Sequence, residues 1–112
     1  MATGYSMSAF NQTHHFVERE QQRGVRHEDL DLVLAYGEMV EEGFVMSDKA
    51  RRRAIDELRK SGDRRAIQKL DHLRNVAVIE QDGQLITVYR TDARHLRVMR
   101  RKNTYHKRLD IE

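Results

Sequence analysis

The chain is 112 residues long, which is a typical length for a single domain. Hydrophobic residues make up 38% of it and charged residues 35%, and no apolar run approaches the roughly 20 residues needed to cross a bilayer. There is no cysteine, which excludes disulfides and thiolate catalysis. The opening segment MATGYSMSAF lacks the basic start and apolar stretch of a secretory signal, so we expect a cytoplasmic protein without a membrane partner.

The net charge of +3 is unevenly distributed. Residues 1–46 carry three basic and eight acidic side chains, whereas residues 47–112 carry eighteen basic and ten acidic ones. The densest basic segment is 90–108, with eight Arg or Lys and a single acid, Asp92. This asymmetry favours a polyanion or an acidic protein as partner. A basic solubilising tail would give the same pattern, and both interpretations stay open here.

Two helices are predicted first in chain order. Residues 1–12 show no periodicity and are expected to form a loose arm. Thr13 is a suitable N-cap and Gly24 a suitable C-terminal stop, which predicts a helix over residues 14–23. The segment RHEDLDLVLAYG, residues 26–37, has acids in its first turn and apolar residues at helical spacing, so it predicts a second helix.

The middle of the chain predicts a short β pair and two more helices. Residues 39–46 have the pattern of two short strands around a turn at Glu42-Gly43. Ser47 can cap a long basic helix over residues 48–62. A further helix is expected over residues 64–75, where apolar residues recur every three or four positions.

A β-hairpin gives the clearest signal in the last third of the chain. The segments VAVIE, residues 76–80, and QLITVYR, residues 84–90, flank the pair Asp82-Gly83, which is typical of a tight hairpin turn. Residues 91–102 could form another strand or a helix, and the sequence leaves this undecided.

These elements predict an α+β protein, with helices packed on one face of a small, mostly antiparallel sheet. We expect a flexible N-terminal arm over residues 1–12, a single domain over residues 13–102 and a basic frayed tail over residues 103–112.

One edge of the first predicted helix carries His15, Arg19 and Arg23, each four residues after the last. On a helical wheel they lie within about 80° of one another and border the buried face marked by Phe16. Two guanidiniums there could bind phosphate oxygens, and the imidazole could move a proton near neutral pH. The alternative is an ordinary surface edge on which the arginines pair with nearby acids. Glu20 faces the core on this wheel and needs a partner, for which neither arginine is excluded.

The second strand of the predicted hairpin contributes Thr87 and Tyr89. These two share one face, while Val88 and Arg90 share the other. If Ile86 and Val88 face the helices, Thr87 and Tyr89 lie on the open face, although a bulge would invert this assignment. Tyr89 could stack on a base or donate its hydroxyl, and the alternative is a half-buried structural tyrosine.

Other kinds of site have little support. His14 and His15 are adjacent, so on a helix they point about 100° apart and cannot easily ligate one ion. There is no His-Glu-x-x-His or Cys/His pattern, no glycine-rich phosphate loop and no nucleophile-elbow serine. We therefore expect neither a metal nor a cofactor.

Two stretches together resemble a known family. In THHFVEREQQRGVRHEDLDLVLAYG the relevant residues are Thr13, His15, Glu18, Arg19, Arg23, Gly24 and Gly37, and in DGQLITVYR they are Asp82, Gly83, Ile86, Thr87, Val88 and Tyr89. These resemble the opening and the closing hairpin of a small bacterial family known as domain of unknown function 4258, across roughly residues 13–91. The chain departs from the family at Phe16, where a small residue is preferred, and at Arg26, where a Ser-like cap is preferred.

The layout of that family looks like the RelE and barnase-type ribonuclease toxins, which place helices on an antiparallel sheet and cleave RNA without metal. The resemblance implies a toxin-like, metal-independent endoribonuclease or an RNA-binding relative of one. RNA would be its substrate or ligand, and an acidic antitoxin or another protein could bind the same basic surface.

In this hypothesis His15 transfers a proton, Arg19 and Arg23 hold phosphate, and Thr87 and Tyr89 orient the substrate. The basic segment would attract the RNA backbone through Arg90, Arg94, Arg97, Arg100, Arg101 and Lys102. The alternative is a non-catalytic nucleic-acid- or protein-binding module of a bacterial or phage regulatory system, in which His15 has no chemical role.

Overall fold

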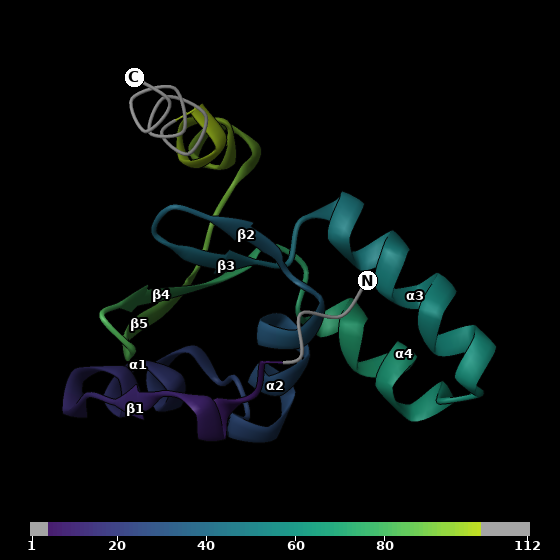
Figure 1. The fold of residues 1–112 in the computed structure, drawn as a ribbon, viewed down its shortest axis with the longest axis horizontal. Helices are drawn as coiled ribbons and strands as arrows, with labels where there is room; N and C mark the ends of the chain where they lie inside the picture. Colours follow the sequence, from purple (N-terminus) through teal and green to yellow (C-terminus); the bar gives the residue numbers. More distant parts are fainter. Residues whose placement is uncertain (1–4, 102–112) are drawn as a thin grey trace.

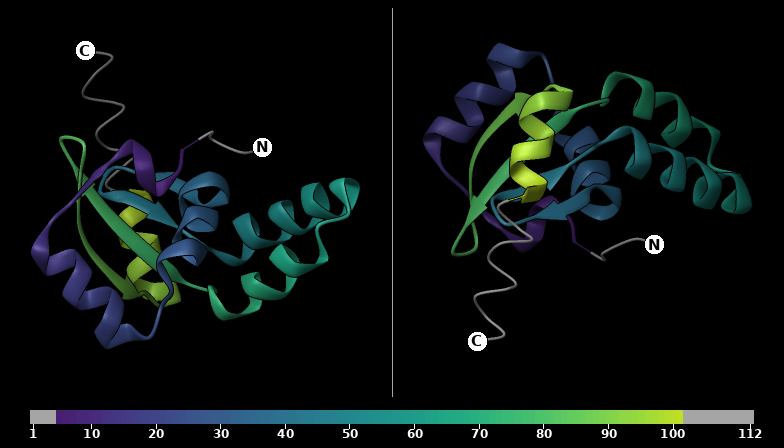
Figure 2. Two further views of the ribbon diagram at one scale, coloured as in Figure 1. Left: turned by 90° about the horizontal axis from the view of Figure 1, so that it is seen from below. Right: turned by 90° about the horizontal axis from the view of Figure 1, so that it is seen from above.

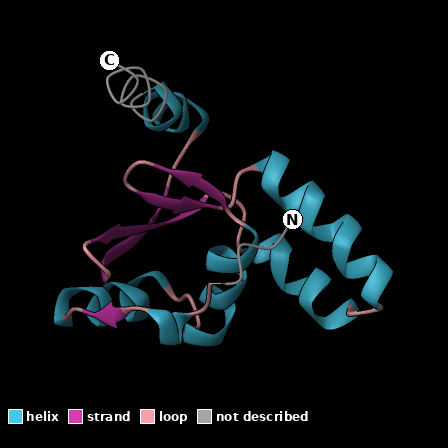
Figure 3. Cartoon of the chain, viewed as in Figure 1, coloured by secondary structure: helices cyan, strands magenta, loops and turns pink. Residues whose placement is uncertain are grey.

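The structure, a computed structural model, describes residues 5–101. Its helices are the 3-10 turn η1 (Met7–Ala9), α1 (His14–Arg23), α2 (His27–Tyr36), α3 (Asp48–Ser61) and α4 (Arg64–His72). Its strands are β1 (Asn11–Gln12), β2 (Glu38–Val40), β3 (Gly43–Val45), β4 (Val76–Gln81) and β5 (Gln84–Arg90). Residues 93–101 form one more helix, here called the C-terminal helix (Figures 1 and 3).

The five strands form one sheet in the order β1-β5-β4-β3-β2. Only the short β1 runs parallel to its neighbour, and the other three pairings are antiparallel. The predicted hairpin is β4–β5, and its turn places Asp82 and Gly83 at φ values of 52° and 83°. These positive angles explain the Asp-Gly pair, because both residues tolerate the left-handed conformation. The predicted α+β fold with a mostly antiparallel sheet is therefore confirmed.

One face of the sheet carries the main hydrophobic core. Helices α1 and α2 cover this face, and the pair α3 and α4 lies next to α2 and extends away from the sheet, as Figure 1 shows. The fully buried side chains that fill it include Phe16 of α1, Leu30 and Leu34 of α2, Leu70 of α4, and Val78 and Val88 of the hairpin. Burial of these apolar side chains is the main term that stabilises the fold.

The opposite face of the sheet is covered by the C-terminal helix (Figure 2, right). Leu96 and Met99 of that helix pack against Val40, Val45 and Ala77 in a second, smaller core. The segment that the sequence left undecided is thus helical over residues 93–101, and it adds a helix to the face that was expected to be open. No helix within residues 5–101 has the length and apolar character required to cross a membrane.

The residues just before α1 are also part of the packed structure. Met7 is buried, and its N–H donates to Asp31 Oδ1 at 2.6 Å. Strand β1 then pairs with the start of β5. Residues 5–12 therefore do not form the loose arm expected from their lack of periodicity, since two-residue and three-residue elements are too short to produce a periodic pattern. The predicted tail over residues 103–112 lies outside the described residues.

Helix ends follow the predicted signals. The Thr13 hydroxyl accepts from the Phe16 N–H at the start of α1, and Ser47 does the same for Ala50 at the start of α3. Gly24 ends α1 in the left-handed conformation. Arg26 precedes α2 without a side-chain cap, which fits the absence of a Ser-like residue there.

Candidate functional site

The predicted edge of α1 is present but lies at the surface. Arg19 Nε donates to His15 Nε2 at 3.4 Å, and Arg19 Nη1 donates to Gln22 Oε1 at 3.2 Å. His15 and Arg23 are exposed. Neither arginine pairs with an acid among residues 5–101, and Glu18 contacts His14 at 3.0 Å. His15 and Arg19 are therefore brought together as the four-residue spacing predicts.

Thr87 and Tyr89 do not join this edge. Thr87 lies opposite Ile79 and Tyr89 opposite Ala77, and both of those β4 residues belong to the face under the C-terminal helix. The Tyr89 hydroxyl is 2.8 Å from His95 Nε2 of that helix. Since α1 packs on the other face, the sheet separates Thr87 and Tyr89 from His15. The predicted convergence of these groups in one cleft is wrong.

As the sequence predicted, Val88 and Tyr89 project on opposite faces of the sheet. The prediction of an open site failed because the face that carries Tyr89 is not open. A bulge opposite Ile79 and Glu80 adds Ile86 to β5, so Leu85 and Val88 both reach the main core. The bulge leaves Thr87 and Tyr89 on the second face. That face is occupied by the C-terminal helix, whose structure the sequence left undecided.

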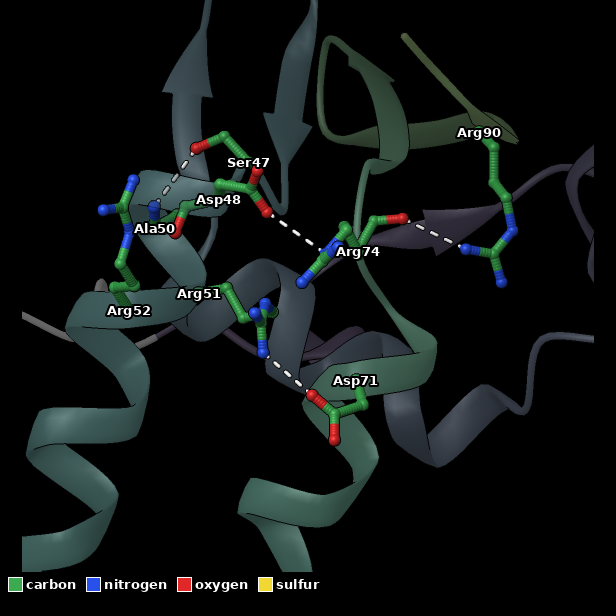
Figure 4. A network of polar contacts seen from close by, with 8 residues as sticks. All are labelled: Ser47, Asp48, Ala50, Arg51, Arg52, Asp71, Arg74 and Arg90. Carbon is green, nitrogen blue, oxygen red and sulfur yellow. Dashed lines mark hydrogen bonds and ion pairs between the residues drawn. The ribbon is translucent and has the colours of Figure 1, made fainter. Parts of the chain in front are cut away.

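Arg90 lies apart from the other basic residues with which it was grouped. It pairs with Val76 and so projects on the face of the main core, next to the end of α4. Its guanidinium donates to the carbonyl oxygens of His72 at 2.8 Å and Arg74 at 3.0 Å, the second of which Figure 4 shows. Arg90 thereby supplies the hydrogen bonds and positive charge that the carbonyl end of α4 lacks.

The arginines of the C-terminal helix divide into two sets. Arg94, Arg97 and Arg101 follow one another at three- and four-residue spacing, and they are exposed, without a hydrogen-bond or ion-pair partner among residues 5–101. We call these three residues the arginine stripe. They lie on the side of the helix away from the buried Leu96 and Met99. Lys102, the next predicted basic residue, lies outside the described residues.

Arg100, the remaining arginine of the described part of the C-terminal helix, differs from the stripe because it is paired with Glu38 at the start of β2. Its Nε and Nη2 donate to the two carboxylate oxygens at 2.6 and 2.7 Å. The Ser47 hydroxyl also donates to this carboxylate, at 3.0 Å. The Arg100 contact, with help from Ser47, lowers the pKa of Glu38. Arg100 therefore fastens the C-terminal helix to the sheet and is not available to RNA as predicted.

Two further arginines, one in α3 and one just after α4, are paired with acids. Arg51 Nη1 contacts Asp71 Oδ1 at 2.8 Å, and Arg74 Nε contacts Asp48 Oδ1 at 3.1 Å (Figure 4). These two ion pairs connect the start of α3 with the end of α4. The number of basic residues in this part of the sequence therefore overstates the charge that is free to bind a partner.

A buried carboxylate–imidazole pair was missed by sequence analysis. Glu20 has only 8% of its side chain exposed, and its Oε2 lies 3.3 Å from His27 Nδ1. Burial raises the pKa of Glu20, and His27 opposes part of that rise. The imidazole itself is 55% exposed, and its Nε2 lies 3.5 Å from Gln12 Nε2. A histidine held at one nitrogen by a carboxylate, with its ring open to solvent, is suited to proton transfer.

The helical wheel correctly placed Glu20 toward the core, but it did not identify the residue that contacts Glu20. The partner comes from the first turn of the next helix, beyond Gly24. Helical spacing does not extend across such a break, so only the folded chain shows that His27, and not Arg19 or Arg23, contacts Glu20.

A cleft of about 410 Å³ lies on the α1 side of the sheet, at the end of β5. We call it the basic cleft. The turn between α1 and α2, the last turn of α4 and Arg90 enclose it, and the lining residues are Gly24, Val25, Arg26, Asp29, Lys69, His72, Leu73 and Arg90. Among the residues that the structure describes, Asp29 is the one carboxylate of the lining, and it contacts Lys69 Nζ at 3.2 Å.

Among residues 5–101 no three His, Asp or Glu side chains are placed so that they could hold a metal ion. The chain matches no family model, no curated protein and no solved structure. Its resemblance to domain of unknown function 4258 and to the RelE and barnase-type toxins stays a prediction.

Proposed function

We propose that this protein binds RNA through the arginine stripe, as a toxin-like endoribonuclease or an RNA-binding relative of one. The observation that carries the proposal is that Arg94, Arg97 and Arg101 have no partner among the described residues, whereas Arg100 on the same helix is paired. Unpaired guanidiniums along one side of a helix suit a row of phosphates, because each can make charge-assisted hydrogen bonds and release counterions.

RNA cleavage without metal requires a base that takes the proton of the 2′-hydroxyl and an acid that protonates the leaving 5′-oxygen. The oxygen–phosphorus bond that forms and the one that breaks leave a 2′,3′-cyclic phosphate and a 5′-hydroxyl. Two imidazoles within residues 5–101 have suitable surroundings. His15 has Arg19 beside it, and His27 has a buried carboxylate behind it.

A non-catalytic RNA-, DNA- or protein-binding module is the second candidate. The separation of Thr87 and Tyr89 from His15 favours it, because the residues expected to form one active site lie on two faces of the sheet. In such a module the basic surfaces would bind the partner, and the exposed His15 would be incidental. An acidic protein could then compete with nucleic acid for the arginine stripe.

A binding and cleavage assay tests these proposals together. Fluorescence anisotropy with a labelled single-stranded RNA should give a dissociation constant in the micromolar range or tighter. Replacing the three stripe arginines by Gln should weaken binding by about tenfold or more, because each neutralised phosphate contributes to affinity. Equal affinity of the two proteins for RNA would refute RNA binding through the stripe.

Cleavage of the same RNA is measured with and without a chelator. An endoribonuclease of this kind should form cyclic phosphate ends with the chelator present, and His15→Ala or His27→Ala should reduce the rate. The matched control is His14→Ala, since His14 is an exposed α1 histidine whose one polar partner among residues 5–101 is the exposed Glu18. Salt-sensitive binding without cleavage would identify the module instead.

A further inference from the structure

The basic cleft collects positive side chains from three separate elements. Arg26 comes from the turn between α1 and α2, Lys69 from α4, and Arg90 from the end of β5. His72 adds an imidazole that can also carry charge. Within residues 5–101, Asp29 is the only acid that lines the cleft, and its charge is offset by Lys69. Three permanent cations against one carboxylate leave a clear excess of positive charge.

Arg90 is held in position before any ligand binds. Its two hydrogen bonds to the carbonyls of His72 and Arg74 fix the guanidinium, and they leave three of its five N–H groups for another acceptor. A cation that is already fixed loses little conformational entropy when it binds an anion. The side chain is still exposed to solvent, so an anion can reach it.

Arg26 contributes a second cation to the cleft, and this one is not held in position by other side chains or carbonyls of residues 5–101. Its side chain makes no hydrogen bond or ion pair with residues 5–101, so it is free to turn toward a ligand. Because Arg26 does not cap α2 with its side chain, the first N–H groups of that helix lack a side-chain acceptor. The positive end of the helix dipole therefore adds to the field at this edge of the cleft.

We propose that the basic cleft binds a phosphate of the RNA backbone, with Arg90 as the fixed contact and Arg26 as the mobile one. This inference rests on the proposed function and names a second contact point for the same ligand. A tetrahedral phosphate offers oxygens to cations that approach from several directions, as Arg26, Lys69 and Arg90 do. The volume of about 410 Å³ also leaves room for an attached nucleoside.

The basic cleft and the arginine stripe are close together along the chain. Arg90 lines the cleft, Thr91 and Asp92 follow, and Arg94 is the first residue of the stripe. One RNA strand that has a phosphate in the cleft can therefore continue around the end of β5 toward the C-terminal helix.

The test is an NMR titration of the ¹⁵N-labelled protein with inorganic phosphate, uridine 3′-monophosphate and a uridine hexanucleotide. The hexanucleotide should shift the amide signals of Gly24, Val25 and Leu73 at lower concentration than either small anion. Arg26→Gln should weaken hexanucleotide binding about fivefold, as expected for one exposed charged contact. The control is Arg59→Gln, since Arg59 is exposed at the far end of α3 and has no partner among the described residues.

A third variant tests how the negative charge of Asp29 affects hexanucleotide binding. Asp29→Asn removes the negative charge from the cleft and frees Lys69, so it should tighten hexanucleotide binding. Tighter binding by this variant together with weaker binding by Arg26→Gln supports the assignment, since a purely structural effect would not move affinity in both directions.

The outcomes separate the cleft from the proposed function. If the protein binds the hexanucleotide but neither cleft variant changes its affinity, the cleft assignment is overturned and RNA binding stands. If the small anions shift the cleft signals as readily as the hexanucleotide, the site takes free phosphate and the RNA assignment is overturned. If no ligand shifts any signal, both proposals are overturned.

Discussion

The ion pair between Arg100 and Glu38 should help to hold the C-terminal helix on the sheet, together with the apolar contacts of Leu96 and Met99. Two short contacts, at 2.6 and 2.7 Å, join the groups, but 42% of the Arg100 side chain is exposed, so solvent screens part of the attraction. We expect a coupling free energy of about 1 kcal/mol, more than a typical surface pair because the contact is bidentate. In a domain of this size that corresponds to about 5 °C in Tm.

A double-mutant cycle with Arg100→Ala and Glu38→Gln, followed by urea and thermal unfolding at pH 7, measures this coupling. Arg97→Ala is the matched control, because Arg97 is exposed on the same helix without a partner among residues 5–101. It should change the free energy of unfolding by no more than about 0.5 kcal/mol. A coupling no larger than the Arg97 effect would refute the idea that this pair fastens the helix.

The same pair gives a pH dependence with a defined sign. The contact with Arg100 lowers the pKa of Glu38, so its contribution is present above the ordinary value of 4.5 and is lost as the pH falls through the folded-state value. The stability difference between wild type and Glu38→Gln should therefore shrink in acid. A difference that grew below pH 4.5 would contradict the assignment of the contact.

Three other changes test the remaining packing and electrostatics. Burial raises the pKa of Glu20, so its contribution to stability is greatest below pH 4.5 and is lost as pH rises. Unfolding at several pH values should show that Glu20→Gln becomes more stable relative to wild type between pH 4 and 7. The reverse trend would contradict this. Met99 is 1% exposed, and Met99→Ala should lower the free energy of unfolding by about 2–4 kcal/mol in urea, whereas a loss under about 1 kcal/mol would show that the second core is loosely packed. A Cβ at Gly43 would lie 2.0 Å from the Val78 carbonyl oxygen, so Gly43→Ala should cost about 3 kcal/mol or more, and a wild-type Tm would contradict the close approach of β3 and β4.

Local signals explain why much of the fold was predictable from sequence. Thr13 and Ser47 cap helices through hydrogen bonds to residues only three positions away. The turn at Asp82 and Gly83 depends on the backbone preferences of those two residues alone. Features of this kind are encoded over a few consecutive residues, so sequence analysis finds them.

Features that depend on tertiary packing were not predictable in the same way. Leu96, Val98 and Met99 fit neither strand nor helical periodicity clearly, and the contact of Leu96 and Met99 with Val45 and Ala77 on the sheet is a long-range property. The environment of Tyr89 follows from that contact, which is why an open face was expected there.

The candidate site shows the same division. The proximity of His15 and Arg19 follows from four-residue spacing within one helix and was predicted. The pairing of Glu20 with His27 crosses from one helix to the next, and the basic cleft joins residues as distant in sequence as Arg26 and Arg90. No periodic pattern connects such residues before the chain folds.

The dependence of RNA affinity on salt concentration is the sharpest test of RNA binding through the arginine stripe. For single-stranded RNA, each neutralised phosphate contributes about 0.7 to the slope of log affinity against log salt concentration. If Arg94, Arg97 and Arg101 each contact a phosphate, replacing all three by Gln should make that slope shallower by about 2. A slope identical to that of the wild-type protein would mean that the arginine stripe does not contact RNA.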